Sequence, residues 1–443
     1  DRSVSRGLGD VYKRQILQIA LPSIVSNITV PLLGLIDVAI VGHLGSPAYI
    51  GAIAVGGMLF NIIYWIFGFL RMGTSGMTSQ AYGKRDLPEI VRLLIRSVGI
   101  GVAVALCLIL LQVPIRQAAF QIIHPTEEVR EMATLYFHIC IWGAPAMLGL
   151  YGLSGWYIGM QNSRIPMYIA ITQNIVNIMA SLSLVCFFGM KVEGVALGTL
   201  IAQYAGFLMG LVLWMNRYGK LKKYIVWKGV LQKEAMIRFF QVNRDIFLRT
   251  LCLVAVTLFF TSAGASQGEI ILAVNTLLMQ LFTLFSYVMD GFAYAGEALS
   301  GRYIGARNQK AFTDTVRHLF IWGAGLTVLF TLVYASGGNA FLALLTDDRN
   351  VITAADTYFY WALAIPAAGI AAFIWDGIFI GATATRGMLL SMAASAVSFF
   401  AVYYGFHTVL GNHALWLAFL VYLSMRGAMQ TLLSRKVMEK SFH

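Results

Sequence analysis

The sequence predicts an all-α polytopic membrane protein with twelve transmembrane helices, arranged as two pseudo-symmetric six-helix lobes. Its 443 residues are 58% hydrophobic and only 12% charged, and the mean hydropathy is +0.73. Soluble domains are about 25% charged, so this composition excludes an ordinary soluble fold. Apolar runs of helix length recur along the chain, and the two halves share spaced landmarks. These observations together indicate a membrane protein built from a repeated helical unit.

Twelve apolar runs are long enough to cross a bilayer, which requires about 20 helical residues. One long polar stretch divides them into two groups of six. The predicted spans cover residues 16–41, 48–70, 91–113, 132–154, 167–188, 194–215, 245–265, 270–297, 316–336, 355–380, 388–410 and 412–433.

The segments outside the spans complete the predicted domain organisation. The first fifteen residues lack an initiating Met and a signal-peptide apolar core, so we expect a disordered or foreign leader. The polar stretch between the lobes sets Trp227 and Tyr224 among lysines, a pattern typical of a segment lying on a membrane interface. The predicted domains are the leader (1–15), an N-lobe (16–215), a basic cytoplasmic linker (216–244), a C-lobe (245–435) and a C-terminal tail (436–443).

The basic residues predict the orientation of the chain in a cytoplasmic (inner) membrane. With these spans, most of the 32 Lys and Arg residues lie on the same side of the membrane as the linker and both termini. The positive-inside rule therefore places the linker and the termini in the cytoplasm. Since the net charge of +12 is accounted for by topology, we expect no nucleic acid partner. The four basic residues on the other side are Arg116, Arg130, Lys191 and Arg349.

The two halves align on shared landmarks. Residues 54–86 match residues 273–308, with three extra residues in the second copy. Each half has an even number of spans, so the second copy enters the membrane in the same direction as the first. Parallel repeats of this kind hold substrate sites between or within the halves. Further matches pair Trp142, Pro145 and Gly159 with Trp361, Pro366 and Gly381.

The first span contains an acid where hydrocarbon is expected. Residues 21–45 include Asp37 together with Pro31 and Gly34. A carboxylate at the centre of a bilayer costs about 2.5–3.5 kcal/mol on insertion scales, so lipid-facing acids are rare. Asp37 is therefore expected to face a helix bundle or a hydrated cavity and to be the main protonation site. Pro31 and Gly34 are expected to form a hinge, because a proline removes a backbone hydrogen bond.

Three further acids fall within C-lobe spans, and each has two interpretations. Asp290 and Glu297 are seven residues apart, which places them on one helix face. They are candidates for ion coupling, although Glu297 also fits a position at the cytoplasmic interface. Tyr287 and Tyr294 lie close to that face and are expected to line a substrate cavity.

The third of these acids, Asp376, lies deep in the tenth span beside Trp375. Asp376 is a candidate ion-coupling residue, and Trp375 a candidate for the substrate cavity. The alternative for Asp376 is a local cap where Gly377 loosens the helix.

The fifth span has a polar stripe on an otherwise apolar helix. Asn174, Asn177 and Ser181 follow one another at helical spacing. Such a stripe either forms hydrogen bonds between helices or lines a hydrated cavity that faces Asp37. We include the two asparagines with the ion-coupling candidates, and Ser181 and Asn27 with the substrate-cavity candidates.

Several stretches are similar to the multidrug and toxic compound extrusion (MATE) family, and the chain is closest to its DNA-damage-inducible F (DinF) subfamily. The resemblance extends over about residues 16–435. It is carried by residues 26–45, 69–86, 174–178, 243–251, 289–308, 375–383 and 411–418.

This resemblance implies a secondary antiporter with two lobes around a V-shaped central cleft. Such a protein exports amphipathic or cationic toxic compounds by alternating access, coupled to entry of H⁺ or Na⁺. The family's first-span acid corresponds to Asp37. Some relatives carry a second acid at the position of Ser181, and the serine here argues against a two-carboxylate site. We expect a monomer in the lipid bilayer, without a cofactor other than the coupling ion.

Two other functions remain as alternatives. A lipid or lipid-linked precursor flippase would need a strongly basic cavity, for which Arg71, Arg249 and Arg426 are the near-span candidates. An integral-membrane transferase would need paired histidines or an Asp-rich metal motif, and neither occurs. The sequence also lacks a Walker A motif and a GxSxG elbow, so it predicts neither an ATP-driven pump nor an enzyme.

Overall fold

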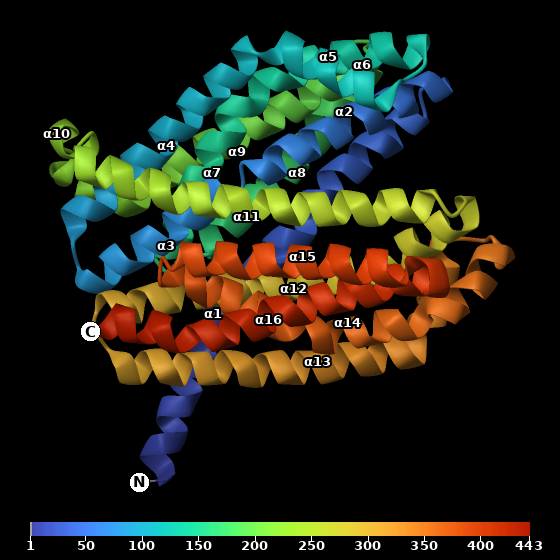
Figure 1. The fold of residues 1–443 in the computed structure, drawn as a ribbon. Helices are drawn as coiled ribbons and strands as arrows, with labels where there is room; N and C mark the ends of the chain where they lie inside the picture. Colours follow the sequence, from blue (N-terminus) through green and yellow to red (C-terminus); the bar gives the residue numbers. More distant parts are fainter. Residues whose placement is uncertain (1) are drawn as a thin grey trace. The chain divides into compact units, whose positions relative to one another are not determined.

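In the computed structural model, the backbone is described for residues 2–443 and the side chains for residues 11–443. This part of the chain is built from helices and connecting turns (Figure 1). The elements are α1 (Arg2–Gly42), α2 (Pro47–Ile66), α3 (Phe69–Lys84), α4 (Leu87–Leu110), α5 (Gln112–Ile123), α6 (Glu127–Cys140), η1 (Ile141–Gly143), α7 (Ala144–Gly159), α8 (Arg164–Cys186), α9 (Val192–Tyr218), η2 (Gly219–Tyr224), α10 (Trp227–Val230), α11 (Lys233–Ala265), α12 (Glu269–Gly305), α13 (Gln309–Leu345), α14 (Arg349–Gly381), α15 (Thr385–Leu410) and α16 (Asn412–Phe442).

Eleven segments of the described chain are long and apolar enough to cross a membrane, and each overlaps one of the predicted spans. The twelfth predicted span lies in α16, which has 31 residues and therefore a length of about 46 Å. This helix carries Asn412, Arg426 and Gln430, and these three polar side chains are buried in the protein interior. The prediction of an all-helical polytopic membrane protein is confirmed.

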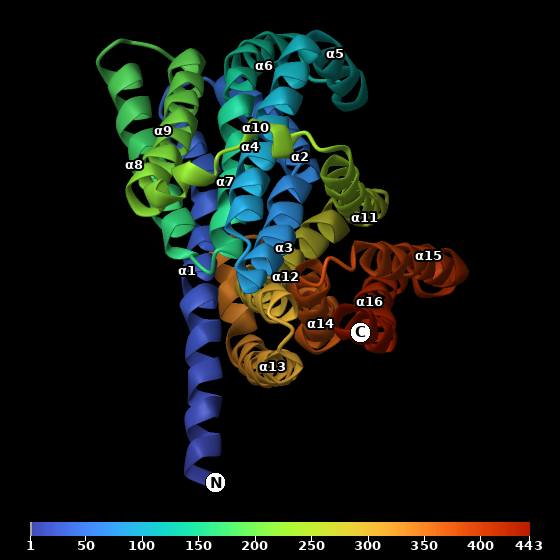
Figure 2. The same ribbon diagram turned by 90° about the vertical axis from the view of Figure 1, so that its left-hand side faces the viewer.

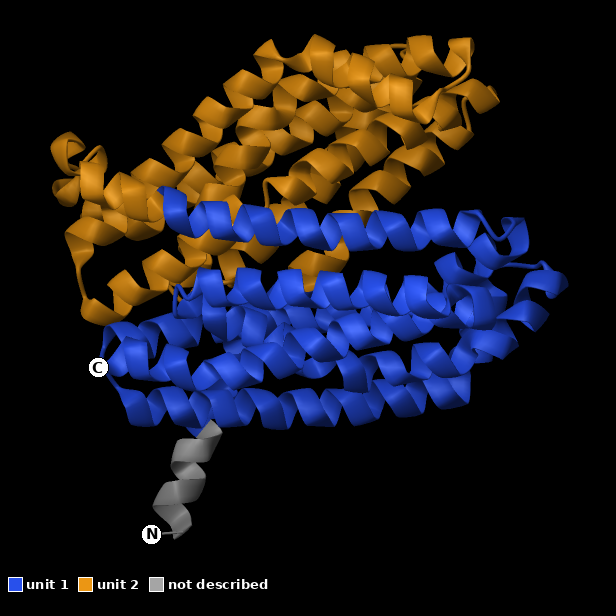
Figure 3. Ribbon diagram, viewed as in Figure 1, with its two compact units in different colours: residues 1–24, 240–443 blue, residues 25–239 orange. Residues whose placement is uncertain are grey.

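The helices form two compact units (Figure 3). Unit 2 covers residues 25–239, and unit 1 combines residues 1–24 with residues 240–443. Both boundaries fall inside long helices, α1 and α11, rather than in loops. The first part of α1 belongs to unit 1, where the Tyr303 hydroxyl donates a 2.6 Å hydrogen bond to Gln15. Of the predicted leader, Asp1 and the side chains of residues 2–10 lie outside the described residues, and residues 11–15 are helical.

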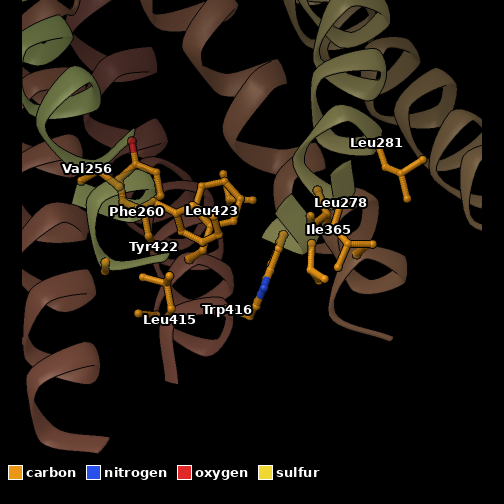
Figure 4. Close-up of a cluster of buried hydrophobic side chains, with 14 of the residues drawn as sticks. Val256, Phe260, Leu278, Leu281, Ile365, Leu415, Trp416, Tyr422 and Leu423 are labelled. Carbon is orange, nitrogen blue, oxygen red and sulfur yellow. The ribbon is translucent and has the colours of Figure 1, made fainter. Parts of the chain in front are cut away.

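Each unit has its own apolar core. In unit 2, Phe60 stacks on Phe137 with ring centroids 5.1 Å apart. In unit 1, Phe260 contacts Trp416 edge to face at 5.0 Å. Figure 4 shows this second core, in which Tyr422 and Leu423 pack with side chains from several helices.

The repeat is visible in how two helices of each unit pack together. In unit 2, a Cβ atom added to Gly155 of α7 would lie 2.3 Å from the Arg71 carbonyl oxygen of α3. In unit 1, a Cβ atom on Gly377 of α14 would lie 2.2 Å from the Ala293 carbonyl oxygen of α12. The helices can approach this closely only because no side chain stands between the backbones.

The two copies differ where the alignment places extra residues. In the first copy the helix is interrupted at Phe67 and Gly68, between α2 and α3. The matching helix of the second copy, α12, is continuous. Likewise, Pro145 stands at the start of α7, after the short helix η1, but Pro366 lies inside the continuous helix α14. A proline fits the first turn of a helix without loss of a hydrogen bond, so the two copies accommodate it differently.

Candidate functional site

Asp37 is buried at the meeting point of α1, α8 and α9, with a side chain that is only 3% exposed. Asn177 of α8 donates its amide N–H to Asp37 Oδ1 at 3.1 Å. Thr199 of α9 donates its hydroxyl hydrogen to Asp37 Oδ2 at 2.8 Å. Both carboxylate oxygens thus accept hydrogen bonds from neutral side chains. Such bonds favour the charged carboxylate, whereas burial favours the neutral acid.

A second layer of polar groups holds these donors in place. Ser181 donates to Asn177 Oδ1 at 3.2 Å, which orients the amide so that its nitrogen faces Asp37. The Thr199 hydroxyl also lies 3.5 Å from Asn177 Oδ1 and 3.1 Å from the Val195 carbonyl oxygen. Because a hydroxyl has one hydrogen, Thr199 can donate to only one of its three acceptors at a time.

Close packing of α8 on α9 brings these groups together (Figure 2). Gly198 lies beside Thr199 in the sequence, and a Cβ atom at this glycine would stand 2.0 Å from Ser181 Oγ. It would also approach the Ser181 backbone nitrogen to 2.9 Å. The absence of a side chain at Gly198 therefore allows the polar faces of the two helices to meet.

A second contact joins α8 to the proline-containing part of α1. Asn174 donates a 2.9 Å hydrogen bond to the Thr29 carbonyl oxygen. Pro31 has no N–H and cannot donate to the carbonyl four residues earlier, that of Asn27. Asn174 therefore binds the α1 backbone near the hydrogen bond that Pro31 cannot make, while Asn177 binds Asp37. The two asparagines of the predicted stripe contact different parts of the same helix.

The second half of α1 is otherwise lightly packed. Between residues 25 and 42, Asp37 and Val41 are the buried residues among those described. At Gly34 no atom lies within 4 Å of an added Cβ. Pro31 and Gly34, the predicted hinge, thus lie in a part of α1 that has few buried side chains.

Asp376 lies in a different environment, inside unit 1. Arg249 of α11 donates to Asp376 Oδ2 at 2.7 Å. Arg426 of α16 donates to the same oxygen at 2.5 Å. Gln430 donates to the other oxygen, Oδ1, at 2.6 Å. Asp376 therefore joins α11, α14 and α16 through a buried ion-pair network.

The remaining predicted site residues lie on α12 and α14. Glu297 is 1% exposed. Asp290, Tyr287 and Tyr294 are half-buried on the same helix. Trp375 donates its indole N–H to Thr431 Oγ1 at 2.9 Å, which places it between α14 and α16. These residues belong to unit 1, whereas Asp37 belongs to unit 2.

The helices of unit 1 that correspond to α1, α8 and α9 meet through aromatic rings. Phe259 of α11 contacts Phe400 of α15 with centroids 4.9 Å apart and Tyr403 at 5.1 Å. The helix contacts around Asp37 in unit 2 are thus polar, whereas these contacts in unit 1 are aromatic. A metal centre is not indicated, since the described residues contain no group of three or more His, Cys, Asp or Glu.

Residues 22–183 and 246–404 match the sequence model of the MatE family. The chain belongs to the MATE family. The DNA damage-inducible protein F of Escherichia coli (strain K12) is 39% identical over 415 residues, which cover 92% of this chain and 89% of that protein. The "Probable multidrug resistance protein NorM" of Thermotoga maritima is 22% identical over 351 residues, covering 77% and 74%.

A likeness in fold agrees with these sequence matches. The Vibrio cholerae MATE transporter VcmN, in its bent form, aligns with a TM-score of 0.86 at 18% identity, covering 98% of each chain. The MATE family and its two-lobe fold, predicted from the sequence, are thereby confirmed. The chain is a multi-pass membrane transporter and not an enzyme.

Sequence reasoning missed Thr199 and the way Asp376 is bound. A threonine in an apolar span is ordinary, and only its place beside Gly198, on the helix that follows the polar stripe, distinguishes it. Arg249 and Arg426 were singled out as basic residues near spans. Their common partner, Asp376, could not be deduced because the three residues are far apart in the sequence.

Proposed function

We propose that this chain is a secondary antiporter that exports amphipathic or cationic toxic compounds by alternating access. The coupling ion is H⁺, with Na⁺ as the alternative, and Asp37 is the protonation site. The single observation that carries this proposal is the burial of Asp37 among neutral donors on a helix that is otherwise lightly packed.

Protonation of Asp37 changes the hydrogen bonds that tie α1 to unit 2. The charged carboxylate accepts from both Asn177 and Thr199. The neutral acid has a hydroxyl group that needs an acceptor. Asn177 directs its amide nitrogen to Asp37, and it could offer its oxygen there only by giving up the hydrogen bond from Ser181. Thr199 can supply an acceptor by turning its own hydrogen toward Val195. Proton uptake thus weakens the tether, since hydrogen bonds to charged groups contribute about 1.5–3 kcal/mol each.

Release of this tether would let α1 bend at Pro31, and this bending would expel substrate outward. The proton then leaves when the site reopens to the cytoplasm, which resets the cycle. The energy source is sufficient, because one charge that crosses a potential of 100 mV provides about 2.3 kcal/mol. The relative described as a multidrug resistance protein supports toxic compounds as the substrate class.

The test is substrate efflux from proteoliposomes with pH and Na⁺ gradients imposed separately. We expect Asp37→Asn to abolish coupled efflux while the protein stays folded, because asparagine fits the site but takes up no proton. Asp347→Asn, at an exposed acid, is the matched control and should transport normally. Coupled efflux that persists in Asp37→Asn would refute the proposal.

A lipid-linked precursor flippase is the alternative function. It requires an unneutralised basic cavity for a pyrophosphate group. Arg249 and Arg426 both bind Asp376, which reduces their capacity to bind an added anion and favours the exporter. A liposome assay that compares dye efflux with scrambling of a fluorescent lipid separates the two functions.

A further inference from the structure

The segment between α9 and α11 combines exposed apolar and basic side chains. We call residues 217–233 the linker surface. Trp227 is 71% exposed and Leu231 is 75% exposed, with Val226 at 50%. Large apolar side chains exposed close together in the sequence are unfavourable in water, and we take them to mark a contact with a partner or a membrane. The exposed basic residues of the linker surface are Arg217, Lys220, Lys222, Lys223, Lys228 and Lys233.

The linker surface is held in a fixed position against α4. Arg96, which is 3% exposed, donates from Nε to the Val230 carbonyl oxygen at 3.1 Å and from Nη2 to that of Gly229 at 3.4 Å. Glu89 lies 3.6 Å from the same guanidinium group. Val230 itself is buried. The apolar residues Trp227 and Leu231 on either side of this anchor are exposed, while the backbone between them is bound to α4.

Charge and position indicate what covers this surface. Residues 217–233 are seventeen consecutive residues without an acidic side chain, and the first acid, Glu234, follows them. The linker surface also continues directly from α9, which crosses the bilayer, so it must emerge at the level of the headgroups. Exposed Trp and Leu with lysines beside them are the features of segments that lie in the interface of anionic membranes.

We propose that the linker surface binds the headgroups of anionic phospholipids, with Trp227 and Leu231 inserted among the acyl chains. Lys220, Lys222, Lys223 and Lys228 contact the phosphates. The partner is thus the membrane that surrounds the protein, and this binding site is distinct from Asp37 and the transport cycle.

The test uses the full chain in phosphatidylethanolamine nanodiscs that contain brominated phosphatidylglycerol or brominated phosphatidylcholine. Bromine quenches tryptophan on contact. The fluorescence of Trp227 is obtained by subtracting the fluorescence of the matching Trp227→Phe variant from that of each protein. A lysine near an anionic surface strengthens association about fivefold. We therefore expect brominated phosphatidylglycerol to quench Trp227 at least fivefold more strongly than brominated phosphatidylcholine. This ratio should fall as the salt concentration rises.

Two charge variants locate the effect. Substitution of Lys220, Lys222, Lys223 and Lys228 by Gln should reduce the preference below twofold. The control substitutes four exposed bases elsewhere, Lys310, Arg435, Lys436 and Lys440, by Gln and should retain it. Equal quenching by both lipids, a preference that survives in the first variant, or no quenching at all would each overturn the proposal. The last result would place the surface in water, as a soluble partner requires.

Discussion

Two buried aspartates in this chain have opposite surroundings. Asp37 accepts hydrogen bonds from the neutral groups of Asn177 and Thr199. Asp376 is bound by two guanidinium groups, those of Arg249 and Arg426. A carboxylate among neutral donors can gain a proton without leaving a charge uncompensated. A carboxylate between two cations cannot, so we assign proton exchange to Asp37 and a bracing role to Asp376.

Replacement of each aspartate by asparagine should separate these roles by stability. Asp376→Asn leaves two buried cations without their counter-charge, and the loss of one partner of a buried ion pair costs about 3–5 kcal/mol. Asp37→Asn leaves no charge unpaired and should change stability by much less. The measurement is the thermal unfolding temperature of the two variants in detergent. Equal unfolding temperatures would contradict the bracing role of Asp376.

The Thr199 hydroxyl should determine where proton exchange occurs on the pH scale. Thr199→Val keeps the shape of the side chain but removes the donor to Asp37 Oδ2. The charged carboxylate is then disfavoured, so the protein should take up its proton at higher pH and efflux at neutral pH should fall about tenfold or more.

A pH profile of efflux measures this effect, and Thr199→Ser, which keeps the hydroxyl, should restore the original profile. An unchanged profile in Thr199→Val would show that the 2.8 Å contact has no role in transport.

At the scale of the helix, the site depends on how closely α8 and α9 approach each other. Gly198 allows that approach, since any added Cβ would meet Ser181 Oγ at 2.0 Å. In contrast, the second half of α1 has few buried side chains, and the contacts of Asp37 and the bond from Asn174 to Thr29 help to hold it. A rigid pair of helices thus holds a loosely packed third one through groups that respond to protonation.

Gly198→Ala should therefore separate α8 from α9. Overpacking in a close interface costs about 1–3 kcal/mol, which should lower the unfolding temperature and also reduce efflux by displacing Thr199. Gly325→Ala is the matched control, because it also adds a methyl group inside a helix but has nothing within 4 Å. If both variants unfold at the same temperature, the close approach at Gly198 is not needed for stability.

At the scale of the whole molecule, the sequence was sufficient for the features that repeat. Apolar runs predicted the spans, and the matches around Gly159 and Gly381 predicted two related halves. Asp37 was predicted as a buried acid because a charge in hydrocarbon is costly.

Features that depend on contacts between distant segments were not predictable in the same way. Thr199 reaches Asp37 across 162 positions, and Arg249 reaches Asp376 across 127. No local pattern records such pairs. The aromatic contacts of Phe259 with residues of α15 likewise appear only once the helices are placed side by side.

The most direct test of the central claim counts the protons released when substrate binds. Calorimetric titration in buffers of different ionisation enthalpy gives this number for the wild type and for Asp37→Asn. With Asp37 as the protonation site, proton release by the wild type should rise towards one proton per substrate as the pH is lowered, and Asp37→Asn should release none. Equal proton release by both proteins would contradict the account.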